Sequence, residues 1–427
     1  MSYRFRSAGC CACLLLCAPL LADGLVRDAI GPISGGRGGA NIAHNDNGAI
    51  LNDNAAGMVF SNTGGLFEFG VDTVILDLDY TDPQNNHVGN KVSPFPVPQL
   101  SLFKVFDDGD VKWAAGFGVV APAGFAAEYK MENPVFGNQT YRSLGALGKF
   151  LRSVAVQLND RLSVGGNFGL AVSHVELEGP FYLQSGPLAG TPTLLNMRST
   201  GYAPTWSIGA QYQATENTVF GINFISRTDF NMNGRADVQV PLGPPPLLFG
   251  RFDADVGITW PSSLGFGVAQ KFGERHRASM DLIWYHWNSA FKNLGMSISH
   301  PDNPVYQMLI GGSHSDAVPL AWRDTLSVRL GYEFFQSTDL TWRLGYTYHG
   351  RPVPSNTLNT YTDGVLEHAF SAGFSRKLDL WTLNCAYQYS FSPTVSVDES
   401  LIAGNDFADS TFRAQAHWIM LSVTRPF

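Results

Sequence analysis

Cysteine is scarce beyond the first 22 residues of this chain. Cys10, Cys11, Cys13 and Cys17 all lie within those residues, and only Cys385 follows them. The chain after residue 22 can therefore form no intramolecular disulfide bond. Many exported proteins are stabilised by disulfide bonds, so this chain, if it is exported, must be stabilised in another way.

Charge is scarce as well. Charged residues make up 15% of the 427 residues and the formal net charge is −8. Loss of Arg4 and Arg6 with the first segment would make this charge more negative still. Proteins that bind nucleic acids usually carry a basic surface, so we expect no nucleic-acid partner.

A hydrophobic run long enough for a transmembrane helix is missing. The apolar run at 10–21 falls short of the ~20 residues that a spanning helix needs, and no later stretch supplies one. This run follows Arg4 and Arg6 and precedes Ala22, which is the pattern of a secretory signal peptide. We predict a signal peptide over residues 1–22 and an exported protein.

What the sequence does contain is a two-residue period. In 325–335, TLSVRLGYEFF, one face carries Leu, Val, Leu, Tyr and Phe, and the other carries Thr, Ser, Arg, Gly and Glu. Residues 339–349, DLTWRLGYTYH, repeat this alternation after a short connection. Two such runs joined by a few residues predict a β-hairpin.

Runs of this kind predict fourteen strands in all. They lie near 65–82, 96–107, 111–124, 145–158, 161–178, 200–214, 217–239, 251–270, 276–294, 322–336, 339–350, 366–377, 380–393 and 411–427. Six connections are tight, and the other seven are long, at 83–95, 125–144, 179–199, 240–250, 295–321, 351–365 and 394–410.

An even number of strands with short turns at one rim and long loops at the other is the pattern of a bacterial outer-membrane barrel. A soluble β-sandwich or barrel also alternates, but fourteen strands would then need several separate cores, and no linker divides the chain. We predict an all-β fold: a 14-stranded antiparallel transmembrane β-barrel over residues 65–427.

A barrel of this width leaves a lumen that its own side chains cannot fill, especially with glycines such as Gly165, Gly331 and Gly345 facing inward. Residues 37–58, RGGANIAHNDNGAILNDNAAGM, follow neither a helical nor a strand period. Small residues let irregular backbone pack against a polar wall. We predict that residues 23–64 form a hatch, or plug, inside the lumen.

In this order, the motifs of the chain resemble those of the FadL-type outer-membrane transporters of long-chain fatty acids and other hydrophobic compounds. The resemblance runs from about residue 31 to the C-terminus. It rests on residues 38–58, similar to the family's hatch; on GFGVVAPAGFAAEY at 116–129, similar to the kinked third strand; and on WRLGYTYHGRPVP at 342–354. Two departures are Asn54-Ala55-Ala56-Gly57, which lacks the family's usual proline, and His349, which replaces a usual acid.

The resemblance implies a channel without chemistry. A hydrophobic ligand would be gathered by an apolar groove between the third and fourth outer loops, pass to a lumenal pocket and leave by a shift of the hatch and the strand kink. Both loops are rich in apolar residues, which marks binding surfaces, although they would also suit a lid. The groove residues are Phe181, Leu183, Leu188, Leu194, Leu195, Leu242, Leu247, Leu248 and Phe249.

The gate is assigned to two sets of residues, Asn52, Asn54 and Gly57 of the hatch, and Gly118, Pro122 and Gly124 of the third strand. Proline cannot donate a ladder hydrogen bond, so Pro122 either opens a bulge in the wall or ends the strand at the outer rim. Sequence alone leaves both open.

Three lumenal side chains are candidates to hold a ligand carboxylate, namely Arg329, Arg343 and His349. A charge-assisted pair with an arginine would serve this purpose. Alternatively, the arginines pair with Glu333, Asp339 or hatch acids such as Asp46 and Asp53, and His349 is a satisfied residue of the rim. The sequence does not decide between fatty acids and aromatic hydrocarbons as ligands.

Two other functional classes compete with the channel for hydrophobic molecules. A general diffusion porin would carry opposed rings of charge in a water-filled lumen, which the low charge content disfavours. Enzymes lack support because nucleophile-elbow, zinc-protease and phosphate-loop motifs are all missing. GGSHSD at 311–316 has no strand–turn–helix frame, but His174 and His286 have the outward parity that a membrane lipase would use. We predict no enzymatic activity, no cofactor and no metal.

The expected location is the outer membrane of a Gram-negative bacterium. Expected partners are the hydrophobic ligand, outer-membrane lipid and lipopolysaccharide, and the barrel-assembly machinery, which such barrels engage through a C-terminal aromatic residue like Phe427. Nothing in the sequence suggests more than a monomer.

Overall fold

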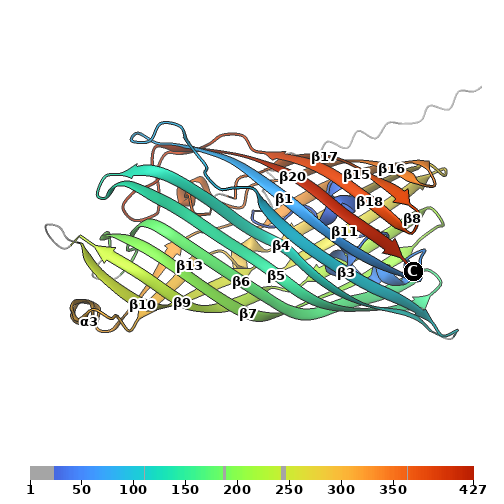
Figure 1. Cartoon of the computed structure of the whole chain (residues 1–427), viewed down its shortest axis with the longest axis horizontal. Helices are drawn as coiled ribbons and strands as arrows, with labels where there is room; N and C mark the ends of the chain where they lie inside the picture. Colours follow the sequence, from blue (N-terminus) through green and yellow to red (C-terminus); the bar gives the residue numbers. More distant parts are fainter. Residues whose placement is uncertain (1–23, 110, 186–188, 242–246, 363) are drawn as a thin grey trace, which may run out of the picture.

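The computed structural model describes residues 24–427, apart from 110, 186–188, 242–246 and 363. These residues form a closed, antiparallel 14-stranded β-barrel, as predicted (Figure 1). The predicted signal peptide lies outside the described residues. Among the described residues, no helix has the length and apolarity needed to cross a membrane.

The helices are short, and the strands carry most of the chain. The helical elements are α1 Gly31–Gly36, α2 Ile50–Asp53, η1 Ala55–Phe60, η2 Trp287–Ser289, α3 Pro304–Ile310 and η3 Ser355–Thr357. The strands are β1 Gly65–Thr81, β2 Val88–Gly89, β3 Phe95–Asp107, β4 Lys112–Asn133, β5 Gly137–Asn159, β6 Leu162–Tyr182, β7 Pro192–Gln213, β8 Thr218–Ile225, β9 Thr228–Val240, β10 Leu248–Trp260, β11 Ser263–Phe272, β12 His276–Tyr285, β13 Asn293–Ser299, β14 Ser313–Pro319, β15 Thr325–Ser337, β16 Leu340–His349, β17 His368–Leu378, β18 Trp381–Phe391, β19 Val395–Val397 and β20 Ser410–Pro426.

Neighbouring strands pair in antiparallel fashion around the whole circumference. The first and last strands close the barrel, with β1 and β20 in register from Leu66 and Pro426 to Thr81 and Thr411. Four of the fourteen barrel strands consist of two segments in tandem: β8 with β9, β10 with β11, β12 with β13, and β14 with β15. The short β2 and β19 pair with the outer ends of β1 and β20.

In the part of the wall near the C-terminus, apolar side chains point outward. Phe168 is 63% exposed, and Trp206 and Phe266 are also exposed, whereas Ser163 and Asn167 on the other face of β6 are buried. In water this arrangement would leave a large apolar surface solvated. It is stable in lipid, where polar backbone groups are satisfied by the closed ladder.

The predicted outer loop at 125–144 is wrong. Here β4 runs on to Asn133 and β5 starts at Gly137, and the two pair up to Asn133 and Gly137. Tyr129 and Met131 face inward and are buried, while Glu128, Lys130 and Glu132 face outward. The prediction failed because this outward face is charged rather than apolar, so the segment does not resemble the membrane-facing strands.

The predicted strands at 217–239 and 251–270 are each interrupted. Below the interruption at Ser226 and Arg227, Phe220 faces outward and is exposed, whereas above it Phe230 is only 2% exposed. Both positions are even-numbered and apolar, so the interruption exchanges the two faces of the strand. The same exchange occurs between β11 and β10 at Pro261 and Ser262.

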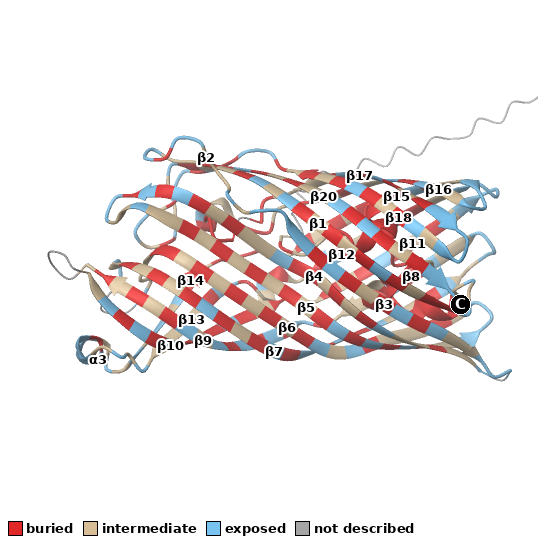
Figure 2. Cartoon of the chain, viewed as in Figure 1, coloured by how far each residue is buried: buried red, intermediate tan, exposed pale blue. Residues whose placement is uncertain are grey.

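Beyond these interruptions the outer part of the wall is built like a soluble β-protein. Its inward side chains are apolar, and its outward side chains are polar, as the alternating burial in Figure 2 illustrates. The outward residues of this part include Asn233, Arg235, Arg251, Asp253 and Asp255. This change of solvent marks where the barrel leaves the membrane.

Residues 24–64 lie inside the barrel, and α1, α2 and η1 are almost entirely buried (Figure 2). Inward glycines of the wall make room for this backbone. A Cβ atom on Gly345 would lie 2.0 Å from the Gly38 nitrogen, and one on Gly165 would lie 2.7 Å from the Ala56 nitrogen. The inward glycines thus permit contact with the N-terminal segment.

Candidate functional site

The wall has a gap between β3 and β4. These strands pair only from Leu100 and Val119 down to Asp107 and Lys112. Further out, the chain before β3 rejoins β4 through a hydrogen bond from the Lys91 N–H to the Glu128 carbonyl (2.8 Å). Between these two points β4 has no partner strand on this side among the described residues.

Pro122 accounts for the gap. The register of β4 against β5 shifts between Val120 and Ala123, so Pro122 forms a bulge, and β4 continues beyond it. A proline cannot donate to the ladder, and a bulge bends its strand away from its neighbour. Of the two readings that the sequence left open, the structure has the bulge.

A short segment from the chain's N-terminal side occupies the inner side of this gap. We call residues 24–28 the strap. The Arg27 N–H donates to the Pro122 carbonyl (2.9 Å), and the Gly124 N–H donates to the Leu25 carbonyl (3.0 Å). Val26 and Ala123 form the bridge between the two segments. The strap therefore completes the β4 ladder that β3 leaves unpaired.

An apolar cavity of about 190 Å³ lies beside the strap and reaches the gap. It is enclosed mainly by aliphatic and aromatic side chains of β1, β4, β5 and β20, and two of the residues that line it, Leu144 and Ala146, belong to the outward face of β5. Its lining includes Val74, Leu76, Leu78, Phe95, Val97, Phe125, Leu144, Ala414, Ala416 and Trp418. The cavity thus lies between the lumen and the lipid-facing side of the wall.

The charged groups that line this cavity have partners. Arg27 pairs with Asp72 (Nη2–Oδ2, 2.5 Å) and lies over the Trp418 ring. Asp28 pairs with His349 (Oδ1–Nε2, 3.0 Å) and accepts a hydrogen bond from Gln388 (2.7 Å). A ligand in this cavity therefore meets apolar surface and charges that are already neutralised.

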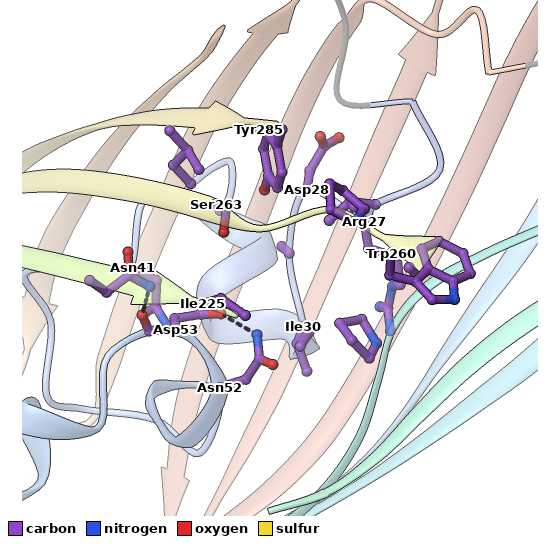
Figure 3. A pocket seen from close by; sticks show the side chains of 18 of the residues that line it. Arg27, Asp28, Ile30, Asn41, Asn52, Asp53, Ile225, Trp260, Ser263 and Tyr285 are labelled. Atoms are coloured by element: carbon purple, nitrogen blue, oxygen red, sulfur yellow. Dashed lines mark hydrogen bonds between the residues drawn. The ribbon is translucent and has the colours of Figure 1, made fainter. Parts of the chain in front are cut away.

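A second, smaller cavity of about 70 Å³ lies on the other side of the strap. Its lining includes Arg27, Asp28 and Ile30 of the N-terminal segment, and Figure 3 shows Tyr285 beside Asp28 and Trp260 on the side of Arg27. Asn41, Asn52 and Asp53 close it on the side of the hatch residues. We call it the polar cavity, because amide and carboxylate groups contribute to its lining.

Lys149 on β5 also lines the polar cavity. Its side chain is buried, with 6% of the residue exposed, and it makes no ion pair or hydrogen bond with the other described residues. The acid nearest to it in electrostatic influence is Asp53, whose carboxylate already accepts from Asn41 (2.6 Å) and Asn52 (3.0 Å). A buried cation without a bonded counter-charge is costly, so an anion would be stabilised beside it.

The three predicted carboxylate-binding residues are engaged elsewhere. Arg343 pairs with Glu333 (2.9 Å), and Arg329 donates to the Asp28 carbonyl (2.5 Å) and to the Tyr285 hydroxyl (3.0 Å). His349 holds Asp28. The alternative reading, pairing of Arg343 with Glu333, describes this structure, whereas Asp339 takes no part in it.

Arg343 belongs to a buried ionic cluster that joins the N-terminal segment to the wall. Glu333 also receives Arg277 (2.5 Å) and Arg37 (3.4 Å), and Arg277 and Arg37 both pair with Asp46. His44, Asp46 and Glu333 lie close enough to share a cation. The three arginines already supply the positive charge, which makes the cluster an anchor rather than a metal site.

The predicted gate residues fall into two groups. Asn52 lines the polar cavity, whereas Asn54 caps η1 and donates to the Ile42 (2.9 Å) and Ala210 (3.1 Å) carbonyls. Gly57 is pressed against the His44 carbonyl. Asn54 and Gly57 thus hold the N-terminal segment in place and lie away from the gap.

Among the predicted gate residues of β4, Gly124 and Pro122 hold the strap, as described above. Gly118 lies below the gap, where it faces Leu51 and remains paired with Ser101. Only Pro122, Gly124 and Asn52 of the six predicted gate residues therefore lie at the two cavities.

The predicted groove residues that the structure describes lie in two places. Phe181, Leu183 and Leu195 line a small cavity with Met296 and Ile298 of β13. Leu248 and Phe249 instead lie at the outer end of β10 beside α3, to which Asn303 (Nδ2 to Phe249 O, 2.8 Å) and Tyr306 (Oη to Leu248 O, 2.8 Å) connect them. Leu194 and Leu247 are partly buried, and Leu188 and Leu242 lie outside the described residues.

Sequence reasoning missed the strap and Lys149. Residues 24–28 fall within the predicted plug, but their sequence, GLVRD, has neither period nor motif that would indicate a role of its own. Lys149 was overlooked because it sits in an otherwise ordinary alternating run. The sequence does contain a sign of it. In the alternating run at 145–158, Lys149 lies on the same face as Leu147 and Leu151, and a lysine on an apolar inward face has few acidic partners.

The comparisons with known proteins agree with this architecture. The family model described as outer membrane protein transport protein (OMPP1/FadL/TodX) matches residues 33–427. None of the curated proteins compared with the chain matches it.

Three solved structures illustrate the likeness of the fold. The toluene transporter TodX of P. putida is 20% identical, with a TM-score of 0.77 over 94% of this chain and 99% of that one. A FadL homologue of Pseudomonas aeruginosa is 15% identical, with a TM-score of 0.73 over 95% and 100%. The toluene transporter TbuX of Ralstonia pickettii is 18% identical, with a TM-score of 0.71 over 94% and 99%.

The family model covers the whole barrel as well as most of the segment inside it. The members of this family are outer-membrane channels for hydrophobic compounds. The fourteen-stranded wall, the apolar lumenal cavity and the bulged strand beside it are consistent with such a channel. The chain belongs to the FadL/TodX family of outer-membrane transport proteins.

Proposed function

We propose that the protein carries uncharged hydrophobic molecules of about the size of one aromatic ring, passively, from the outer surface into the outer membrane through the gap between β3 and β4. The observation that carries the proposal is the apolar cavity that reaches this gap. Its volume of about 190 Å³ compares with ~150 Å³ for an apolar cavity that binds benzene.

The chemistry of the cavity favours a neutral ligand. Burial of apolar surface drives binding by ~25 cal/mol per Å², and this term needs no partner charge. A carboxylate in the apolar cavity would have to displace Asp28 from His349 or Asp72 from Arg27. Two of the structures similar in fold, TodX and TbuX, are described as toluene transporters, which supports the same ligand class.

The exit requires a displacement of the strap. The strap is held to β4 by the two backbone hydrogen bonds described above, to β1 by the Arg27–Asp72 pair, and to the opposite wall through Asp28, which contacts His349, Gln388 and Arg329. Moving these few residues would open the cavity to the lipid without moving the ionic anchor at Glu333. A concentration gradient then suffices to drive uptake.

The test is to fill the cavity. Ala416 is fully buried on its lining, whereas Ala372 on β17 faces outward and is exposed. We expect Ala416→Phe to weaken toluene binding to the detergent-purified barrel at least about tenfold, while Ala372→Phe leaves it unchanged. Equal toluene affinity in the two variants, measured by displacement of an environment-sensitive fluorophore, would refute the assignment of the cavity.

A second candidate function, uptake of long-chain fatty acids, is favoured by Lys149. A fatty acid whose tail lies in the apolar cavity would have to pass the strap to bring its carboxylate to the polar cavity. There Lys149 offers a charge-assisted hydrogen bond that the paired arginines do not.

Lys149→Met separates the two candidates. For a fatty-acid carrier we expect oleate affinity to fall at least about tenfold and toluene affinity to stay unchanged. Lys104→Met, at an exposed lysine of β3, is the matched control. If oleate does not bind the unsubstituted protein, or binds Lys149→Met equally well, the second candidate fails and the first is unaffected.

A further inference from the structure

The loop between β19 and β20 packs against other segments at the outer end of the barrel. We call residues 398–409 the lid. The Leu401 N–H donates to the Asn356 carbonyl (2.8 Å), and the Ala403 N–H donates to the Gln184 side-chain oxygen (2.9 Å). These contacts join the lid to two other outer segments, the β6–β7 connection and the loop that contains η3.

Gly404 allows the lid to close on the β6–β7 hairpin. Its φ of +86° is in the left-handed region, and a Cβ atom there would lie 2.3 Å from the Tyr182 ring. Only glycine fits both the backbone conformation and this close approach. The lid is therefore seated on Tyr182 rather than lying loosely above it.

Beneath the lid lies a third cavity, the vestibule cavity. The lid contributes Ile402, Asp406 and Phe407 to its lining, and the wall and other loops contribute Leu177, Pro180, Phe181, Tyr182, Leu294, Val318, Leu320, Asn359, Tyr361 and Thr362. The ionisable groups of this lining are the Asp406 carboxyl and the hydroxyls of Tyr182 and Tyr361. The cavity includes Phe181, one of the predicted groove residues.

Asp406 has no cationic partner in this setting. It makes no ion pair or hydrogen bond with the other described residues. The titratable groups that face it are Asp82, after β1, and the hydroxyls of four tyrosines: Tyr80 of β1, Tyr141 of β5, Tyr182 of β6 and Tyr361 of the η3 loop. None of these groups can supply a positive charge, and Asp82 supplies a second negative one.

We infer that the lid is a pH-sensitive cover of the vestibule, closed while Asp406 is protonated and opened when Asp406 ionises. The neutral carboxyl suits the apolar cavity, whereas the carboxylate is driven toward water by its surroundings and by Asp82. This inference concerns access to the vestibule and is independent of which ligand the lumen takes.

The direction of the effect follows from the pKa of Asp406. Burial, with a smaller contribution from Asp82, raises this pKa from 3.8 to about 7 in the closed lid. In an open, hydrated lid the pKa returns to its ordinary value. Closure is therefore strongest below about pH 4 and weakens as the pH rises toward about 7.

Hydrogen exchange of the lid measures this opening without any ligand. We expect the protection factor of the peptide that contains Leu401 and Ala403 to fall at least about tenfold between pH 5 and pH 7.5, since each unit of pKa difference allows up to a tenfold change. A peptide from β20 reports the stability of the barrel itself and should not change.

Asp406→Asn keeps the side chain neutral. In this variant we expect protection at pH 7.5 to be at least as high as that of the unsubstituted protein at pH 5. Asp398→Asn, at an exposed acid of the same lid, should keep the pH dependence. A flat profile in the unsubstituted protein, or a persistent pH dependence in Asp406→Asn, would overturn the inference.

Discussion

Glycine residues of the barrel wall determine how closely the N-terminal segment packs against it. Gly345 lies against Gly38 and Arg37, and Gly331 lies against the Arg37 side chain and carbonyl. The sequence placed these glycines on the inward face correctly. It could not show that backbone rather than ligand fills the space beside them, because an inward glycine is equally compatible with both.

The first prediction concerns Gly345. A methyl group there would lie 2.0 Å from the Gly38 nitrogen and 2.4 Å from the Arg37 carbonyl carbon, and overpacking of this kind costs ~1–3 kcal/mol. We expect Gly345→Ala to lower the melting temperature and to expose residues 31–60 to protease. Gly148→Ala is the matched control, since nothing lies within 4 Å of its added methyl group. Equal melting temperatures and equal cleavage would contradict the prediction.

Charged residues show where prediction from sequence reaches its limit. Sequence gives the number of lumenal cations but not their partners, and the partners decide which cation is available to a ligand. Arg343 of β16 is neutralised by Glu333, which lies directly opposite it on β15. This pairing is one of the two arrangements that the sequence allows for Arg343. Lys149 differs because the strands beside it bring no acid into bonding distance, a property of three-dimensional neighbours.

At the scale of single elements, the strap is the part of the chain most suited to move. Its backbone completes one edge of β4, and it separates the apolar from the polar cavity. Periodicity could not identify it, because a strand of this length pairs only where a bulged neighbour offers it an edge. Pro122 signalled that bulge in the sequence, but the partner lies about a hundred residues earlier.

The second prediction is that fixing the strap blocks uptake. Val26 and Ala123 are directly opposite each other, and Cα atoms of facing antiparallel residues lie ~4.5–5.5 Å apart, within the range that a disulfide spans. In a Cys385→Ser background, we expect Val26→Cys/Ala123→Cys to stop toluene uptake into proteoliposomes when oxidised and to restore it when reduced.

Each single cysteine variant serves as the control for the second prediction. Neither should respond to oxidation. Undiminished uptake by the oxidised double variant, with the disulfide verified by mass spectrometry, would show that the ligand leaves by another path.

Strand continuity was the other element-scale feature that sequence misjudged. The apolar residues of 217–239 are even-numbered throughout, so the period predicts one uninterrupted strand. The interruption at Ser226 and Arg227 instead exchanges the two faces. The even-numbered apolar residues face the lipid below it and the interior of the barrel above it. A period of two reveals which residues share a face, and only the surrounding solvent reveals which face is the apolar one.

At the scale of the whole molecule, the barrel consists of two parts with opposite polarity. The part near the C-terminus has an apolar outer surface, and the part that carries α3 has a polar one. The number of strands, the order of the tight turns and the closure by the last strand all followed from the sequence. The height of the wall did not, because the strands that rise above the membrane lack its apolar outer face.

The third prediction locates this boundary. Ile222 lies below the interruption at Ser226 and Arg227, and Asn233 lies above it, both with outward side chains. In a Cys385→Ser background reconstituted into liposomes, we expect a membrane-impermeant maleimide to label Asn233→Cys and not Ile222→Cys. A lipid-soluble quencher should show the reverse order for fluorophores at the two sites.

Labelling of both cysteines to the same extent would place the boundary elsewhere. In denaturant both should react, which excludes a defective thiol as the cause of a negative result.

The position of the strap between two cavities has a consequence for how occupants of the two sites affect each other. Displacing the strap costs free energy. If a molecule in one cavity has already displaced it, a molecule in the other cavity binds without that cost. By linkage, each occupant must then change the affinity of the other by the same factor. A short carboxylate such as hexanoate, held beside Lys149, would accordingly act as an effector of hydrocarbon release, and toluene would in turn tune the affinity for hexanoate. Unequal factors in paired titrations would show that the two sites are not joined through this one segment.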